Sequence, residues 1–439
     1  MRILIANYRY FVSSGPERYL FNVVPRLEAL GHQVAPLSVR YSLNQPSDYE
    51  RYFVSPLAGE DAVYFDDHKK TPATIGKTLA RLFYSKEVET AAERLVADFK
   101  PDVAYVLYYL RKMSPSLLVG LKKQGVPIVV RLSDYGMFCP EHHCLRDGAP
   151  CTLCLGGDLT HSVRNKCLKG SRVISALDAA ATMFHRWRGY FNLIDAFIAT
   201  NDFMRDMMVK AGFDAQRLHV APTFTDDGAF APPASDGGRS GLLYVGRLDK
   251  PKGVEVLLRA LAALKRRGGA PPLLRLAGDA HAPGYMDELK ALAVRLGIEE
   301  HTDFLGYMPP DALPRLYAAA RGVVLPALWF ENLPNSLLEA MASGTPPIVS
   351  DIGSLAAVIS HERTGLKAPP GDPEGLADAI ARLDGDDALW RRLSAGALEA
   401  SRTEFSAETH LSRLLPVLQR YSGVDDPPET APQPFAVSA

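Results

Sequence analysis

The sequence has almost no net charge, no long apolar run and few cysteines. Its 49 Lys and Arg nearly balance 50 Asp and Glu, and the formal net charge of −1 predicts no nucleic-acid partner. No uninterrupted apolar stretch approaches the roughly 20 residues that a membrane helix needs. The opening residues, MRILIANYRYF, lack the apolar core and the cleavage site of a secretory signal. We therefore expect a cytoplasmic protein.

Several catalytic signatures are also missing. The sequence has no G-x-G-x-x-G after its first apolar run, no Walker A loop, no H-E-x-x-H and no G-x-S-x-G. These absences argue against a dehydrogenase with a dinucleotide cofactor, a P-loop NTPase, a zinc protease and an α/β-hydrolase.

The sequence does contain a regular alternation of short apolar runs and amphipathic segments. Runs such as RILIAN, DVAYVLY and GVVLPAL are typical of buried parallel strands, and residues 254–267 and 335–343 have helical patterns. Such alternation predicts βαβ units in an α/β protein. Because about a dozen predicted strands are too many for one compact sheet, we predict two doubly wound, Rossmann-like domains.

A Gly-, Pro- and Asp-rich stretch divides the chain. Residues 223–240 read as a linker between a first domain, 1–222, and a second domain, 241–405. A helix over 406–422 is expected to cross back to the first domain. The Pro-rich, polar tail, 423–439, is expected to be disordered.

Two glutamates flank a predicted helix start in ENLPNSLLEAMASG, residues 331–344. Ser336 and Glu339 have the spacing of a capping box, so a structural role alone is one alternative for Glu339. Glu331 follows an apolar strand instead, where open α/β sheets bind ligands. A helix N-terminus binds phosphate, and carboxylates accept hydrogen bonds from hydroxyls, so the motif suggests a nucleotide-sugar ligand.

A second candidate lies in YVGRLDKPKG, residues 244–253. Gly246 ends a predicted strand, and Arg247 and Lys252 lie on the connection to the next helix. Two cations at a strand-to-helix turn could bind a diphosphate. The alternative is two solvated surface cations.

In this order, the two segments resemble the C-terminal domain of retaining GT-B glycosyltransferases of family four. GRLDKPKG matches the phosphate-binding Arg and Lys of that family, and ENLPNSLLEAM matches its Glu-x7-Glu motif. The resemblance covers about residues 1–422 and is strongest over 242–383. It implies a GT-B fold, in which two Rossmann-like domains face a cleft.

For the second domain, the resemblance implies a donor site. Arg247 and Lys252 would neutralise the diphosphate of a UDP- or GDP-sugar, Glu331 would bind hydroxyls of the donor sugar, and Glu339 would bind the ribose. Backbone at the helix start would approach the phosphates and the sugar. The implied donor-binding set is Gly15, Gly246, Arg247, Lys252, Glu331, Leu333, Pro334, Asn335 and Glu339.

For the first domain, the resemblance implies an acceptor side. Gly15 resembles the glycine-rich first loop of the family, although a simple turn glycine is the alternative. RLSDYGMFCP resembles a segment that usually reads His-Asp-Tyr near the reacting carbon, but here Ser133 replaces the histidine. Asp134 would orient the acceptor hydroxyl or stabilise the transition state; an N-cap is its alternative.

The implied reaction is retaining transfer from a nucleotide-sugar to a saccharide or lipid-linked acceptor, in cell-surface polysaccharide or glycolipid synthesis. No metal cofactor is expected for catalysis. An epimerase or a phosphorylase is a second enzyme hypothesis, and Ser133 gives weight to a third: a catalytically degenerate GT-B scaffold. The implied catalytic set is Asp134, Glu331, Arg247 and Lys252.

All five cysteines fall between Cys139 and Cys167, in the segment 139–167. Cys151 and Cys154 form a C-x2-C pair, which with Cys139 and Cys167 could hold a structural zinc ion. Reduced thiols and disulfides are the alternatives, and disulfides are disfavoured in a reducing cytoplasm.

The stretch CLKGSRVISALDAAATMFHRWRGYF, residues 167–191, is basic and aromatic. It predicts either a membrane-surface patch for a lipid-linked acceptor, at the inner face of the membrane, or an ordinary helix with core aromatics. In both cases the protein would be peripheral at most.

Overall fold

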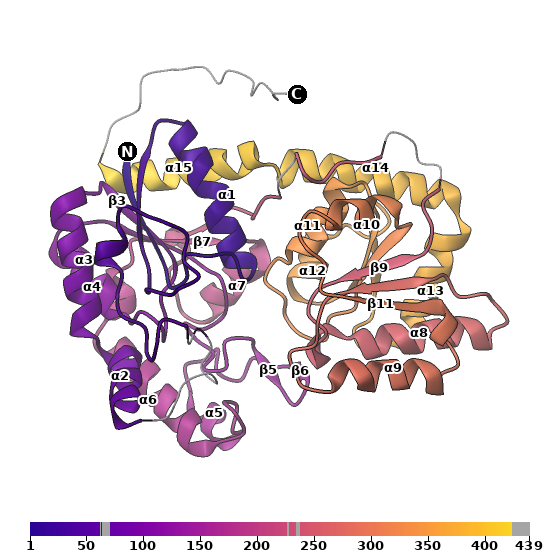
Figure 1. The fold of residues 1–439 in the computed structure, drawn as a ribbon, viewed down its shortest axis with the longest axis horizontal. Helices are drawn as coiled ribbons and strands as arrows, with labels where there is room; N and C mark the ends of the chain where they lie inside the picture. The colour runs from indigo at the N-terminus through magenta and orange to yellow at the C-terminus, as the bar shows by residue number, and fades with distance from the viewer. Residues whose placement is uncertain (62, 64–70, 226–227, 234–237, 424–439) are drawn as a thin grey trace.

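The computed structural model describes residues 1–61, 63, 71–225, 228–233 and 238–423, and it confirms the predicted α/β fold with two six-stranded sheets. Every strand pair within these two sheets is parallel. Figure 1 shows the two domains side by side, with the long helices at the C-terminal end of the chain running along both. None of the helices in the described part of the chain combines the length and the apolar character that a membrane crossing requires.

The first sheet has the strand order β2-β1-β3-β4-β7-β8. Its central strands are continuous apolar runs because helices cover both faces. Leu4 of β1 packs in one core cluster, and its neighbour Ile5 packs in another on the opposite face. The strands are β1 Arg2–Asn7, β2 Gln33–Leu37, β3 Val103–Tyr108, β4 Ile128–Arg131, β7 Ala196–Ala199 and β8 Leu218–Val220. The helices are α1 Gly15–Ala29, α2 Pro72–Phe83, α3 Lys86–Phe99, α4 Ser116–Lys123, α5 Thr160–Arg164, α6 Arg172–Trp187 and α7 Asp202–Lys210.

The second sheet has the strand order β11-β10-β9-β12-β13-β14. Its strands are β9 Leu242–Val245, β10 Leu274–Ala277, β11 Thr302–Gly306, β12 Gly322–Leu325, β13 Pro347–Ser350 and β14 Leu366–Ala368. Its helices are α8 Val254–Arg266, α9 Tyr285–Arg295, α10 Leu313–Ala319, α11 Asn335–Ala342, α12 Gly353–Val358 and α13 Pro373–Gly385.

Two further helices follow, α14 Asp387–Glu404 and α15 Ala407–Ser422. Helix α14 packs on the second domain, where Ala397 and Ala400 join the core beside α11. Helix α15 instead packs on the first domain through Leu414 and Leu418. The predicted linker, 223–240, is described only in part, and the predicted disordered tail lies outside the described residues apart from Gly423, the C-cap of α15.

The segment 139–167 leaves the first sheet after β4 and forms a short hairpin, β5 Leu145–Arg146 with β6 Ala149–Pro150, before α5. Figure 1 shows the hairpin between the two domains and α5 at the lower edge of the first domain. Its contacts with both domains are part of the candidate site.

Candidate functional site

The candidate donor residues lie at the carboxyl ends of β9 and β12, where the strand order of the second sheet reverses. Strand β9 pairs with β10 on one side and with β12 on the other. Such a switch point leaves a crevice between the loops that follow the two strands. The loop after β9 carries Gly246, Arg247 and Lys252, and the loop after β12 carries Glu331.

Gly253 brings these two loops together. Its φ is +74°, and a Cβ at this position would lie 1.8 Å from the carbonyl oxygen of Pro326. Only glycine allows this approach, since the clash would be with backbone. The Leu328 amide also donates to the Pro251 carbonyl at 2.8 Å. Lys252 is therefore fixed beside the loop that carries Glu331.

Lys252 and Glu331 form an ion pair of 2.6 Å between Nζ and Oε1. Trp329 Nε1 donates to the same carboxylate oxygen at 2.8 Å, and its ring lies 5.5 Å from Lys252 Nζ. The Lys252 side chain is 20% exposed and that of Glu331 10% exposed. The structure thus brings a carboxylate and a cation together in a largely buried position at the switch point.

Arg247 is more open. Its side chain is 56% exposed and lies 3.3 Å from Asp249. Its backbone carbonyl accepts a hydrogen bond of 2.7 Å from the Tyr244 hydroxyl, and Gly246 before it has a φ of +153°. The turn is held by its backbone, so the guanidinium is free to reorient toward an anion.

Helix α11 begins at Asn335, after Pro334 in an extended conformation, and its start has no side-chain cap. The alternative in which Ser336 and Glu339 form a capping box is therefore excluded. Glu339 instead accepts hydrogen bonds of 2.7 Å from Arg18 of the first domain and from the Tyr317 hydroxyl. Glu339 therefore binds two residues distant in sequence and no cap amide. A buried carboxylate loses its hydration, and a single backbone amide would not offset that cost.

Glu339 is 3% exposed. Burial raises its pKa, and the Arg18 guanidinium and the Tyr317 hydroxyl lower it in part. Leu333, the other predicted residue of this loop, is buried in the core of the second domain, so only its backbone is near the helix start.

Gly15, the first residue of α1, faces α11 across the two domains. Asn335 is the first residue of α11, and a Cβ placed on Gly15 would lie 3.8 Å from its Nδ2 atom. The loop before α1 is held by the buried Glu17, which accepts hydrogen bonds from Ser13 and Ser14 at 3.1 and 2.5 Å. Two helix N-termini, both favourable for anions, therefore meet at the same place.

Asp134 follows β4 and contacts a histidine that the sequence analysis did not single out for this role. His142 Nδ1 lies 2.9 Å from its carboxylate, and the Gly136 amide donates at 2.8 Å. Burial alone would raise the pKa of Asp134, but the charge and hydrogen bond of His142 and the Gly136 amide lower it to about 2. Asp134 is not a helix N-cap, and Ser133 donates to the Leu107 carbonyl instead of reaching the site.

A small residue at position 136 makes the contact with His142 possible. A Cβ on Gly136 would lie 2.8 Å from His142 Nδ1 and 2.9 Å from Asp134 Oδ1. The only signal in the sequence was this glycine between Asp134 and a pair of histidines, which does not distinguish His142 from His143.

Asn332 also escaped the sequence analysis, although it joins the domains. Its side chain donates to the Leu132 carbonyl at 3.0 Å and accepts from Thr200, and its carbonyl accepts from Asn201 at 2.7 Å. The Tyr135 hydroxyl adds a bond of 3.3 Å to the Glu331 carbonyl. These bonds hold the first domain against the loop that carries Glu331.

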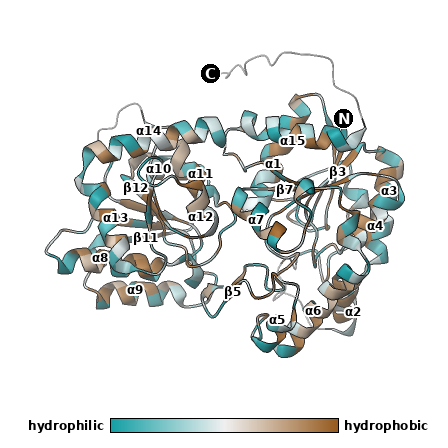
Figure 2. Ribbon diagram, turned by 180° about the vertical axis from the view of Figure 1, so that it is seen from behind, coloured by the Kyte–Doolittle hydropathy of each residue, from teal (hydrophilic) through white to brown (hydrophobic). Residues whose placement is uncertain are grey.

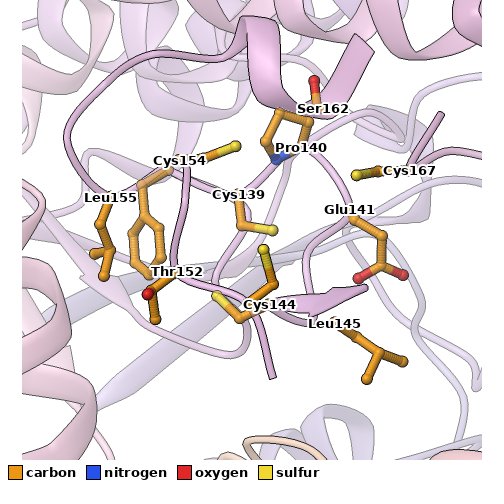
Figure 3. Close-up of a pocket in the computed structure, with 12 residues that line it drawn as sticks. Cys139, Pro140, Glu141, Cys144, Leu145, Thr152, Cys154, Leu155, Ser162 and Cys167 are labelled. Carbon is orange, nitrogen blue, oxygen red and sulfur yellow. The ribbon is translucent and has the colours of Figure 1, made fainter. Parts of the chain in front are cut away.

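All five cysteines line one small cavity of about 20 Å³. Figure 3 shows the sulfurs of Cys139 and Cys144 pointing toward one another, with those of Cys154 and Cys167 turned toward the same space. The cysteines are free thiols, so no disulfide is formed among them. A hydrogen bond from Cys144 lowers the pKa of Cys139 to about 7, and the same bond raises the pKa of Cys144.

As the side chains lie, no group of three His, Cys, Asp or Glu residues within the described ranges is placed to hold a metal ion. The cysteines are gathered as predicted, but they do not form a ready coordination sphere. Zinc at Cys139, Cys151, Cys154 and Cys167 stays a prediction.

Two family models together span most of the chain. Residues 14–223 match the glycosyl transferase 4-like domain, and residues 227–399 match glycosyl transferases group 1. D-inositol 3-phosphate glycosyltransferase of Corynebacterium glutamicum is 32% identical over 220 residues, covering 47% of this chain and 52% of the relative. Mannosylfructose-phosphate synthase of Agrobacterium fabrum is 30% identical over 241 residues, covering 51% and 53%. The matched region thus spans about half the length of these relatives.

Solved structures extend the similarity to the whole fold. A sucrose-phosphate synthase from Thermosynechococcus elongatus superposes with a TM-score of 0.68 at 20% identity, covering 96% of this chain and all of that one. Anabaena HepE, in complex with UDP and glucose, gives a TM-score of 0.64 at 19% identity, covering 96% of this chain and all of that one. The chain belongs to the group 1 glycosyltransferases, similar to family four, and has the GT-B fold.

Proposed function

We propose that the protein is a retaining glycosyltransferase that moves a sugar from a UDP- or GDP-sugar to a saccharide or lipid-linked acceptor. The observation that carries the proposal is the meeting of two helix N-termini, at Gly15 and Asn335, the second of which lies between Glu331 and Glu339 in the sequence. Amide groups suit the phosphates and carboxylates suit the sugar hydroxyls, as a nucleotide-sugar requires. Anabaena HepE, of the same fold, binds UDP and glucose, which favours UDP.

In this proposal, Arg247 and Lys252 bind the diphosphate, and Lys252 turns from Glu331 to do so. The bond between the anomeric carbon and the diphosphate oxygen breaks, and the acceptor hydroxyl oxygen bonds to that carbon. The hydroxyl proton leaves on the released diphosphate. Stabilisation of the departing negative charge by the two cations and the helix amides supplies most of the rate enhancement.

Asp134 then acts through its charge. A carboxyl with a pKa of about 2 is a poor general base near neutral pH, but it is a permanent hydrogen-bond acceptor. Asp134 is therefore suited to orient the acceptor hydroxyl and to stabilise positive charge at the anomeric carbon. His142 supplies an imidazole beside Asp134, although Ser133 occupies the usual position. This contact weakens the alternative of a degenerate scaffold.

The test is calorimetric binding of UDP and GDP. We expect one of them to bind and Arg247→Ala to weaken that binding by roughly 10- to 100-fold, since a charge-assisted hydrogen bond is lost. Arg266→Ala, at the opposite end of α8, is the matched control and should bind as the wild type does. Equal affinity in Arg247→Ala would remove Arg247 from the donor site, and binding of neither nucleotide would contradict the proposed donor.

A further inference from the structure

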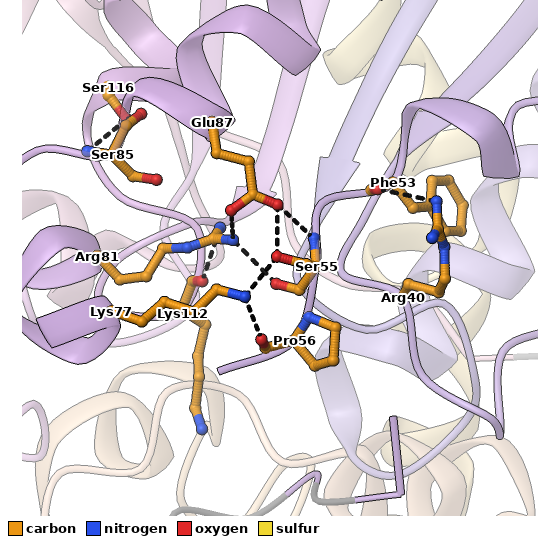
Figure 4. Close-up of polar contacts among 10 residues, drawn as sticks. All are labelled: Arg40, Phe53, Ser55, Pro56, Lys77, Arg81, Ser85, Glu87, Lys112 and Ser116. Carbon is orange, nitrogen blue, oxygen red and sulfur yellow. Dashed lines mark hydrogen bonds and ion pairs between the residues drawn. The ribbon is translucent and has the colours of Figure 1, made fainter. Parts of the chain in front are cut away.

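Helix α2 exposes two large apolar side chains, Ile75 and Leu79. Its only buried residue is Arg81, whereas Ile75 and Leu79 are 51% and 37% exposed. Figure 4 shows Arg81 and Lys77 pointing into the domain. Arg81 donates to the Ser55 carbonyl and to Glu87, both at 2.9 Å. The helix is therefore attached by its polar side, opposite to a normal surface helix.

Helix α6 has the same inverted pattern. Its buried residues are small or polar, and most of its large apolar residues are exposed; Phe184 is half-buried. The buried ones are Ser175, Asp178, Ala179, Ala181, Thr182 and His185. The exposed ones are Val173, Ile174, Leu177, Met183 and Trp187, and Val173 and Trp187 are 77% and 78% exposed. The predicted core aromatics are buried only beyond the helix, at Tyr190 and Phe191.

The two helices lie side by side and form one face, the α2–α6 face, which consists of Ile75, Leu79, Val173, Ile174, Leu177, Met183 and Trp187. The Phe83 and Phe184 rings are 5.8 Å apart, and His185 contacts the Phe83 carbonyl at 3.3 Å. Figure 2 shows hydrophobic residues along both helices at the edge of the first domain. Half of the 14 large apolar side chains exposed in the described residues belong to this face. Concentration of this kind marks an interaction surface.

A cavity of about 500 Å³ lies beside these helices, and Tyr108 and Leu110 line both this cavity and the small pocket at Asp134. Apolar side chains supply most of its lining surface, among them Leu57, Leu82 and Leu110, and Ile174 and Leu177 of α6. Five charged residues also line it: Arg111, Lys112, Glu141, Lys169 and Asp178. The Tyr108 hydroxyl lies 3.3 Å from Nδ1 of His142, the partner of Asp134. A molecule in this cavity would run from the α2–α6 face to the proposed acceptor position.

The stretch of sequence that carries α6 is rich in basic residues. Residues 164–188 contain six Lys or Arg and one acidic residue, Asp178, although the whole chain has a net charge of −1. Asp178 is itself paired with Arg111 at 2.8 Å. Exposed apolar side chains flanked by cations are typical of a surface that rests on anionic lipid. A protein partner would not by itself account for the apolar cavity behind the face.

We propose that the α2–α6 face rests on an anionic lipid surface and that the cavity takes the hydrocarbon chain of a lipid-linked acceptor, whose hydroxyl reaches Asp134. The acceptor part of this proposal rests on the proposed function. The apolar chain lies against Leu82, Leu110 and Leu177, and the cations outside hold the lipid phosphate.

The first experiment measures sedimentation of the full chain with vesicles of phosphatidylcholine containing about one-third phosphatidylglycerol. We expect binding that weakens in high salt, and a fall of about tenfold in partitioning for Val173→Ser with Trp187→Ser. The matched control changes two exposed valines elsewhere, Val209→Ser with Val294→Ser, and should bind as the wild type does. Equal sedimentation of both double variants, or self-association through this face in place of vesicle binding, would overturn the proposal.

The second experiment tests the cavity with soluble probes. Dodecyl phosphate, kept below its micellar concentration, should bind at least about tenfold more tightly than butyl phosphate, because only the longer chain fills the apolar walls. Leu177→Glu should remove this difference and Leu177→Met should preserve it. Equal binding of the two probes by the wild type would overturn the cavity assignment.

UDP binding, measured on the same samples, separates this proposal from the proposed function. Vesicle and dodecyl phosphate binding without nucleotide binding would support the lipid site and contradict the donor proposal. Nucleotide binding without lipid binding would overturn the lipid site alone.

Discussion

The contact between Arg18 and Glu339 allows a sharp test of the interface between the domains. Replacing Arg18 by Met keeps the length of the side chain and removes its charge. Glu339, 3% exposed, then keeps only the hydrogen bond from Tyr317. We expect the protein to lose stability in a manner that depends on pH.

The magnitude follows from burial. Breaking a buried ion pair by removing one partner costs about 3–5 kcal/mol. The Arg18 side chain is 33% exposed, so water replaces part of the lost interaction, and we expect a cost of roughly 1–2 kcal/mol near neutral pH.

The pH dependence follows from the raised pKa of Glu339. Because its pKa in the folded state lies above that in the unfolded state, ionised Glu339 destabilises the fold, and this effect disappears as the pH falls through the raised pKa. Arg18 offsets the effect only while Glu339 is ionised. The stability difference between the wild type and Arg18→Met should therefore be large at about pH 8 and shrink in acid, beginning above the pKa of an exposed glutamate.

The assay is urea unfolding at a series of pH values. Glu339→Gln supplies the control background, because Arg18→Met should cost little stability once the carboxylate is gone. A cost that is the same at every pH, or one that persists in the Glu339→Gln background, would refute the proposed coupling.

Three further predictions follow from other contacts of the site. Gly253→Ala should lower the free energy of unfolding, measured in urea, by at least about 3 kcal/mol, because strain at positive φ adds to a clash with the Pro326 carbonyl. Gly268 also has a positive φ but open space around it, so Gly268→Ala should lower it by only about 1–2 kcal/mol. Equal losses in the two variants would contradict the argument. His142→Gln should move the acid limb of the pH–rate profile to higher pH, because Asp134 loses the charge that holds its pKa at about 2 and then protonates at a higher pH. An unchanged profile would show that His142 does not control the protonation of Asp134. Elemental analysis of the purified protein should find about one zinc per chain if Cys139, Cys151, Cys154 and Cys167 bind the ion, and metal-free protein would show that they pack as thiols.

The sequence predicted the two sheets and the place of the proposed donor residues in the fold because both depend on local signals. Apolar runs between helices define parallel strands, and loop residues after such strands collect at one edge of a sheet. Arg247, Lys252 and Glu331 were found in this way, and the structure brings Lys252 and Glu331 into contact. Helix α3 was missed although Val88, Ala92, Leu95 and Phe99 have helical spacing and are buried.

Other features depend on contacts that no local pattern contains. Glu339 has the spacing of a capping box, but its partners come from residue 18 and residue 317. Helix α2 was missed for a related reason. Its buried residue is Arg81, so it has no buried apolar stripe of the kind that predicts a surface helix. In both cases the deciding interaction is a buried charge that finds its partner far away in the sequence.

The two adjacent histidines of the segment 139–167 contact different domains. His142 contacts Asp134 of the first domain, whereas the His143 ring lies 4.9 Å from that of Trp329, which donates to Glu331 in the second. The segment therefore connects the proposed acceptor carboxylate to the proposed donor carboxylate through a single peptide bond between the histidines. Because its cysteines pack around one cavity, their packing fixes where both histidines lie. A loop that composition alone would assign to metal binding or to structural thiols thus contacts both the proposed acceptor side and the proposed donor side.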